Sequence, residues 1–231
     1  MAIVDEVSWG RSLEAFRDAA GWFVTVTARV GDRWEAGGLG SWSVRDLVGH
    51  TSRSLLTVEA YLDVPATSVD ADTTAAYFRL TAAVVDDPAV EERGRAAGAA
   101  LGSDPAGAVA EIAERVLRRV GECRGEELLT TAAGGMRLAD YLPTRTFELV
   151  AHTCDLARAV DAEPDPPAGP AAEALRLVAD LAVAGDRAGP LLLAVTGRER
   201  LPDGFSVLRL STPHSERRSE RVSGGRTTFP A

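Results

Sequence analysis

The chain has 231 residues and contains no lysine, so all of its basic residues are arginines; asparagine and glutamine are absent as well. Without lysine, Schiff-base catalysis, a P-loop phosphate site and a lysine general base are all excluded. The glycine-rich dinucleotide motif, the Walker motif and the nucleophile elbow of serine hydrolases are also missing.

Cysteine, apolar runs and positive charge are also scarce. Two cysteines, Cys123 and Cys154, are too few for a secreted disulfide scaffold, so we expect a reducing, cytoplasmic location. No apolar run approaches the roughly 20 residues that span a bilayer, and the N-terminus lacks a basic flank followed by an apolar segment. We therefore expect no membrane partner and no signal peptide. A net charge of −9 argues against a nucleic-acid partner.

Helical periodicity dominates the rest of the sequence. It predicts long helices over about 8–29, 43–62, from 104 onward and 140–160, with one or two short helices within 72–101. The fold class that we predict is all-α. A four-helix bundle is expected over residues 1–162, and a short C-terminal α(+β) extension over 163–210 with a helix at 170–186 and a strand at 205–210. Residues 211–231 are polar and unpatterned, which predicts a disordered tail.

Local signals define where two of these helices begin. Ser43 with Asp46 three residues later predicts a capping box at the second helix, with Asp in the place usually held by Glu. Trp42, just before the cap, is expected to be a packing anchor. Asp104 followed by Pro105 is typical of a helix start, because the missing N–H of proline would be unpaired there anyway.

The fourth long helix carries an ionisable stripe in step with the helical repeat. Its members are Tyr141, Arg145, Glu148, His152 and Asp155. The apolar stripe formed by Leu138, Leu142, Leu149 and Leu156 lies immediately beside it. The ionisable groups therefore lie on the flank of the core, where charges are costly unless they are paired or bound to a metal. Ion pairs that merely solvate a helix flank are the alternative.

The second helix adds a further inner histidine. His50 lies on the side that also carries Leu47, and the third histidine, His214, belongs to the polar tail. If the second and fourth helices are neighbours, His50, Glu148 and His152 converge. Two imidazoles and a carboxylate suit Zn²⁺ or another divalent ion such as Ni²⁺, and three protein ligands leave a position open for a substrate.

Two segments resemble a known family. The sequence GLGSWSVRDLVGHTSRS at 38–54, together with RTFELVAHTCDLARAV at 145–160, is similar to the DinB-like metal-binding superfamily, within it the mycothiol-dependent maleylpyruvate isomerases. The resemblance covers roughly residues 8–162. It implies an up-down bundle with a crossover and a divalent metal, usually zinc, on His50, Glu148 and His152.

The resemblance also implies an activity. Members use a low-molecular-weight thiol, mycothiol, as cosubstrate, and act on small electrophiles as thiol-dependent isomerases or S-transferases. The stretch LLLAVTGRERLPDGFSVL resembles the start of the C-terminal region of the isomerases, with Arg198 as a substrate contact.

Other residues of the two motifs have expected roles. Asp155 or a backbone carbonyl is expected to orient one of the imidazoles through the ring nitrogen that does not bind the metal. Arg145 either steadies Glu148 or meets an anionic substrate, and Arg45 forms either a surface ion pair or a contact for a carboxylated substrate at the entrance.

Two other functions stay open at this stage. The same three ligands would serve a metal-dependent hydrolase. A non-catalytic binding protein on a vestigial bundle is the other alternative. For all three functions we expect a monomer or a homodimer.

Overall fold

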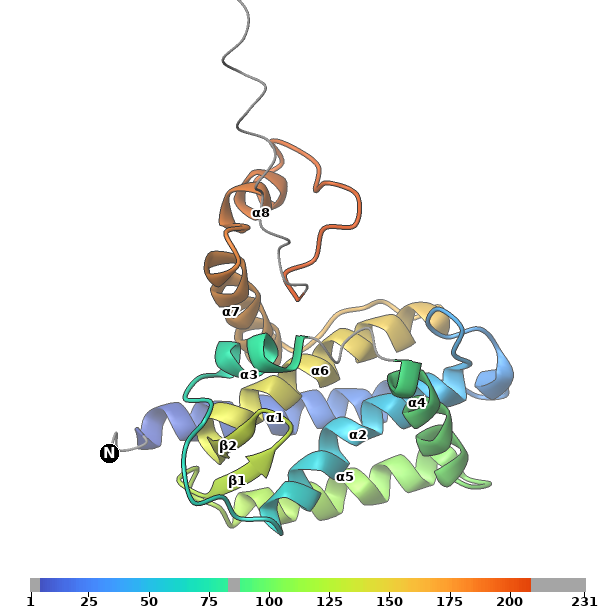
Figure 1. Cartoon of the computed structure of the whole chain (residues 1–231). Helices are drawn as coiled ribbons and strands as arrows, with labels where there is room; N and C mark the ends of the chain where they lie inside the picture. Colours follow the sequence, from blue (N-terminus) through green and yellow to red (C-terminus); the bar gives the residue numbers. More distant parts are fainter. Residues whose placement is uncertain (1–4, 83–87, 209–231) are drawn as a thin grey trace, which may run out of the picture.

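The computed structural model describes residues 5–82 and 88–208, which form a helical protein with one small hairpin (Figure 1). The elements, in chain order, are α1 (Glu6–Thr27), η1 (Arg33–Glu35), α2 (Val44–Leu62), α3 (Thr74–Thr81), α4 (Pro88–Ala100), α5 (Pro105–Gly121), β1 (Leu128–Thr131), β2 (Gly134–Arg137), α6 (Leu138–Ala159), α7 (Ala168–Ala184) and α8 (Ala188–Val195). The predicted all-α class is confirmed.

Helices α1, α2, α5 and α6 make up the bundle. α1 packs against α5 and α6, and α2 packs against the same two helices, so that the four enclose one core. Figure 1 shows that α2 returns antiparallel to α1, whereas α5 runs in the same direction as α2. The long connection through α3 and α4 makes this parallel pair possible, which agrees with the predicted crossover.

The two predicted helix starts are confirmed. The side chain of Ser43 accepts a hydrogen bond from the backbone N–H of Asp46, and the Asp46 carboxylate accepts one from the backbone N–H of Ser43. Asp104 caps α5, and Pro105 is its first residue. Each cap satisfies N–H groups that have no partner within the helix, so the chain enters α2 and α5 at defined points.

Helix α4 lies against α2 with the two backbones almost in contact. A Cβ on Gly49 of α2 would lie 2.1 Å from the backbone nitrogen of Gly98 of α4, so neither position accommodates a side chain without a shift of a helix. Gly94 of α4 faces the indole of Trp42 in the same way, and the Trp42 indole N–H donates to the Glu91 carbonyl at 3.2 Å. Trp42 is thus the predicted packing anchor.

In the described part of the C-terminal extension, the regular elements are the helices α7 and α8. α7 packs against α1 and α6 and adds Ala174, Leu177 and Leu181 to the bundle core, while α8 packs on α7 and projects from the bundle (Figure 1). The predicted strand at 205–210 is wrong for residues 205–208: residues 205 and 206 are irregular, and 207 and 208 form a bend. The Arg187 side chain donates to the Ser206 carbonyl in this segment. Within residues 5–82 and 88–208 no strand lies beside residues 205–208 to pair with. Residues 209 and 210 lie outside the described range, as does the predicted tail.

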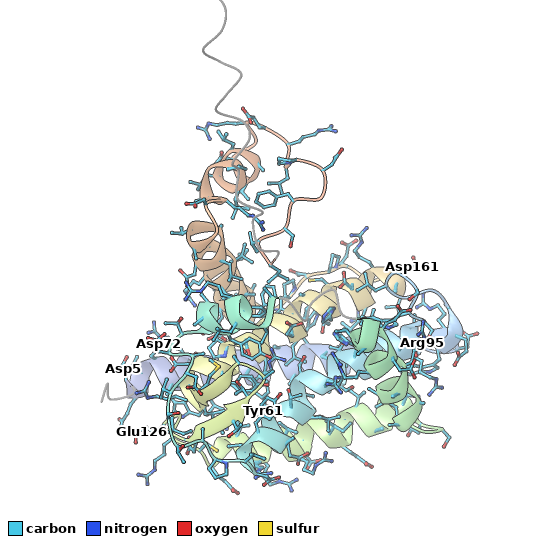
Figure 2. The ribbon with its side chains drawn as sticks, viewed as in Figure 1. Asp5, Tyr61, Asp72, Arg95, Glu126 and Asp161 are labelled. Carbon is cyan, nitrogen blue, oxygen red and sulfur yellow. The ribbon has the colours of Figure 1, made fainter. Side chains whose placement is uncertain are left out.

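The hairpin of β1 and β2 was not predicted. Its strands have four residues each and pair antiparallel, from Leu128 opposite Arg137 to Thr131 opposite Gly134. The hairpin leads directly into α6, whose first turn it fixes through the Leu138 N–H, which donates to the Glu127 carbonyl at 2.8 Å. Asp161, which is labelled in Figure 2, follows the other end of α6. Its carboxylate forms an ion pair at 3.1 Å with Arg33 of η1, the short helix after α1.

Within the described ranges, no helix combines the length and the apolar character needed to cross a bilayer.

The contact between α2 and α4 generates a prediction about stability. Gly49→Ala should lower the free energy of unfolding by about 1–3 kcal/mol, because the added methyl group overpacks a backbone contact. Gly21→Ala on α1 is the matched control: its Cβ meets nothing within 4 Å, so relief of the helical glycine should raise stability by about 0.5–1 kcal/mol. Urea unfolding followed by circular dichroism measures both, and equal effects of the two substitutions would contradict the close contact.

Candidate metal centre

Three possible ligands from two helices meet at the flank of the core. One donor atom from each of His50 on α2 and Glu148 and His152 on α6 lies within 4.8 Å of the other two. The imidazole rings of His50 and His152 meet edge to face with centroids 4.8 Å apart. Because residue 50 is about one hundred positions from the other two, only the packing of α2 on α6 brings the donors together.

The carboxylate and one imidazole already form a pair. His152 Nε2 lies 3.2 Å from a Glu148 oxygen, and the two side chains are 18% and 23% exposed. Two donors that share one ion at the usual Zn–N and Zn–O distances of about 2.1 Å are at most about 4.2 Å apart. In the tetrahedral arrangement that zinc favours, donors are about 3.4 Å apart, so a pair of donors at the 4.8 Å limit has to approach by about 1.4 Å to share an ion.

Asp155 lies on the other side of the His152 ring. Its carboxylate is 3.3 Å from His152 Nδ1, so it accepts the Nδ1–H and leaves Nε2 directed at Glu148. A carboxylate behind a ligating imidazole fixes the tautomer and increases the basicity of the other nitrogen. Asp155 therefore contacts the His152 ring, as their separation of three residues on a helix predicts.

His50 is held differently. The indole of Trp42 packs on its ring with centroids 4.5 Å apart, and its buried Nδ1 has no hydrogen-bond partner among the described residues. A buried nitrogen without a partner is costly, and a cation or a polar ligand is one way to satisfy the ring. Together with the donor set, this nitrogen indicates that the residues present fit a divalent ion.

The protonation states follow from this environment. Burial, together with the positive charge of His152, lowers the pKa of His50 to about 4. Burial alone would raise the pKa of Glu148, but the hydrogen bond from His152 and the charge of Arg145 hold it at about 2. Burial alone would likewise lower the pKa of His152, but its hydrogen bonds to Asp155 and Glu148 raise it to about 9. At pH 7 Glu148 and His152 therefore share one proton.

The predicted arginines lie in different places. Arg145 is 8% exposed and packs between the rings of Tyr77 and Tyr141, one turn before Glu148. Arg45 forms an ion pair with Glu35 at 3.1 Å and donates to the Gly102 carbonyl. Of its two predicted roles, the structure therefore shows the surface ion pair. Arg198 is exposed in the turn after α8. The structure therefore brings Arg145 to the ligand triplet, but not Arg45 or Arg198.

A cavity of about 230 Å³ opens beside the triplet, and sequence analysis missed most of its lining. Its α2 wall consists of His50, Arg53, Ser54, Thr57 and Tyr61. Positions 50, 54, 57 and 61 follow steps of three and four, and 53 lies beside them on the same helix face, a pattern that was present in the sequence. Tyr61, labelled in Figure 2, comes from the C-terminal part of α2 and packs on Tyr141 of α6, with centroids 5.5 Å apart.

The comparison with family models gives one finding. The model described as the mycothiol maleylpyruvate isomerase N-terminal domain matches residues 25–157, which is more than half of the chain and includes all three possible ligands. No curated protein and no solved structure matches the chain.

The protonation of the triplet predicts the pH dependence of metal binding. His152 has to lose its proton to bind an ion, whereas His50 and Glu148 are already deprotonated at pH 7. Binding of Zn²⁺ at pH 7 should therefore release about one proton, and the affinity should rise about tenfold per pH unit between about pH 5 and 8. Above the pKa of His152, near 9, this rise should end.

Calorimetry in two buffers of different ionisation enthalpy measures the released protons. An affinity that does not change between pH 6 and 8 would contradict the assignment of the shared proton.

The contact behind His152 predicts a smaller effect. Asp155→Asn keeps a hydrogen-bond acceptor near Nδ1 but removes its charge, so it should weaken zinc binding by about 10-fold or more. Competition with a chromophoric chelator measures the affinity. Asp161→Asn, which removes a carboxylate at the far end of α6, should bind zinc like the unsubstituted protein; equal losses in the two variants would argue against the role of Asp155.

Proposed function

This chain belongs to the family of the mycothiol maleylpyruvate isomerase N-terminal domain, and we propose that it is a divalent-metal-dependent enzyme that uses mycothiol as cosubstrate. The proposed reaction is an S-transfer or a thiol-dependent isomerisation of a small electrophile, in the cytoplasm and with zinc as the metal. The observation that carries this proposal is the convergence of His50, Glu148 and His152 within 4.8 Å at the edge of a cavity.

These three residues are the ones that would hold the ion. A divalent cation bound there supplies positive charge that favours the thiolate form of a thiol, whose ordinary pKa near 8.5 leaves only a few per cent ionised at neutral pH. Glu148 provides the one negative charge of the donor set. Three ligands are fewer than zinc takes in a closed structural site, which supports a catalytic rather than a structural role.

The protein's own groups have defined tasks in this reaction. Asp155 holds the His152 ring in one tautomer, and Trp42 holds the His50 ring from the other side. The cavity brings the electrophilic carbon next to the triplet. The thiol would lose its proton to solvent before its sulfur forms a bond to carbon. In a transferase, the bond to the leaving group breaks and its electron pair departs with that group. In an isomerase, the π electrons of the double bond move onto the adjacent carbonyl oxygen, and after rotation about the resulting single bond they return to restore the double bond as the thiolate leaves.

Metal content and thiol dependence test the proposal together. The purified 231-residue protein should contain about one zinc per chain. His50→Ala and His152→Ala should each lose it, because removal of a ligand weakens binding by more than the roughly 10–100-fold caused by removal of a hydrogen-bond partner of a ligand. His214→Ala is the matched control, since His214 is the third histidine and lies outside the described residues. It should retain the metal.

Incubation of the metal-loaded protein with mycothiol and a panel of electrophiles should give S-conjugates or isomerised products, detected by mass spectrometry and chromatography. Chelation of the metal and the two histidine variants should abolish them. Zinc-free protein as isolated, or product formation that is indifferent to chelation, would refute the proposal, and hydrolysis products formed without the thiol would favour a metal-dependent hydrolase instead.

A further inference from the structure

Exposed large apolar side chains gather on helices α7 and α8, which project from the bundle (Figure 1). Among the described residues nine large apolar side chains are exposed, and five of them lie between positions 175 and 201. Helix α8 includes Leu191, Leu192, Leu193 and Val195, yet none of its residues, all of them within the described range, is buried. A helix that is apolar on every side is normally covered by other elements. This segment therefore points to a further contact surface.

The exposed side of α7 carries an apolar stripe. Leu175 and Val183 are 67% and 68% exposed, and the exposed Ala179 lies midway between them in the sequence. Steps of four residues keep these three on one side of the helix, opposite Leu177 and Leu181, which are buried against the bundle. A small residue at the centre lets a second helix approach closely, with the larger side chains packing before and after it.

Two charged residues run along one flank of this stripe. Arg176 and Asp180 are exposed, and each follows a residue of the stripe by one position. Two copies of α7 that pair antiparallel about a two-fold axis at Ala179 bring Leu175 of each copy opposite Val183 of the other. The same pairing brings Arg176 of each copy within reach of Asp180 of the other. Parallel pairing would instead place like charges beside each other, which is unfavourable. The exposed side of α7 is therefore complementary to itself in its apolar contacts and in its charges.

We propose that this side of α7 is the interface of a homodimer, in which α7 pairs antiparallel with α7 of a second copy. The dimer face consists of Leu175, Arg176, Ala179, Asp180 and Val183. Such a pairing is isologous, so each contact on one side of the axis is repeated on the other. The inference is independent of the proposed function, because neither the three possible metal ligands nor the described lining of the cavity beside them belongs to α7 or α8.

Residues 209–231 are the part of this chain that could compete for the dimer face. Their large apolar side chains are Leu210, Val222 and Phe229, and five arginines accompany two glutamates there. A segment with so few apolar residues has less apolar surface to offer the stripe than a second copy of the stripe itself. The second copy is therefore the occupant that the composition favours.

Sedimentation and light scattering of the 231-residue protein test the proposal. The mass should rise from 24.3 kDa towards twice that value between about 1 and 200 µM chain. Leu175→Glu puts a carboxylate into the apolar contact on both sides of the axis and should weaken dimerisation by at least about tenfold. Val64→Glu is the matched control. Val64 is 50% exposed but lies beside the hairpin, where its carbonyl accepts from the Thr130 N–H at 2.8 Å, so this change should leave the dimer intact.

A charge swap tests the orientation of the two helices. Arg176→Asp alone places carboxylates opposite each other and should weaken dimerisation by about five- to tenfold. Arg176→Asp combined with Asp180→Arg should restore the dimer, because the attraction is the same with the signs exchanged. If the double variant is as weak as the single one, antiparallel pairing about Ala179 is wrong.

A disulfide across the axis is a second measurement that does not depend on weakening the interface. In a background of Cys123→Ser and Cys154→Ser, Ala179→Cys should form a covalent dimer in air. Only residues near the axis come within the roughly 4–7 Å between Cα atoms that a disulfide spans. Ala172→Cys, two turns earlier on α7, should not cross-link, since the two copies of residue 172 would lie about 20 Å apart.

A mass of 24.3 kDa at every concentration would overturn the inference and leave the face to residues 209–231 or to a different protein. A dimer that Leu175→Glu leaves intact would place the interface elsewhere and overturn it as well, as would equal cross-linking by Ala179→Cys and Ala172→Cys. Circular dichroism melts establish that each variant is folded.

Discussion

The constraint on which this site depends is the negative charge of Glu148 at the flank of a helical core. Burial disfavours an ionised carboxylate, and here it is opposed by a hydrogen bond from His152 at 3.2 Å and by the charge of Arg145. Breaking such a pair by removal of one partner costs about 3–5 kcal/mol when the pair is buried. The spacing of the charged groups on α6 is therefore not free, because Arg145 and His152 must each lie one turn from Glu148, and Asp155 must follow within reach of His152.

The second requirement is that α2 presents His50 to this pair at a fixed depth. Trp42 packs on the His50 ring, and α4 holds the indole in turn through Gly94 and the Glu91 carbonyl. Gly49, directly before His50, allows α4 to approach α2 so closely that their backbones nearly touch. Helix α4, which carries none of the three donors, thus determines where one of them lies. The crossover between α2 and α5 is the part of the chain that makes this arrangement possible.

The features that the sequence predicted are those that depend on local periodicity. The helices, the Ser43–Asp46 capping box and the ionisable stripe of α6 all follow from spacings of three or four residues. The hairpin at 128–137 was missed because its strands have four residues each, too few for an alternating pattern to stand out. The supposed strand at 205–210 failed because an apolar run needs a partner strand, which the described chain lacks there. Arg53 and Arg93 were missed as cavity residues because only tertiary packing decides which side chains line a cavity.

The opposite charges of Arg145 and Glu148 lie one helical turn apart on α6 but do not form a direct ion pair. A direct ion pair with Glu148 would neutralise both groups, leaving a weak cation site and a weak anion site. Instead, two tyrosine rings at 5.1 Å hold the guanidinium, and no described carboxylate lies within 4.0 Å of it. The positive charge then faces the cavity, and the carboxylate faces the two imidazoles. Residues of one helix therefore place a positive and a negative group at the same cavity without joining them in an ion pair.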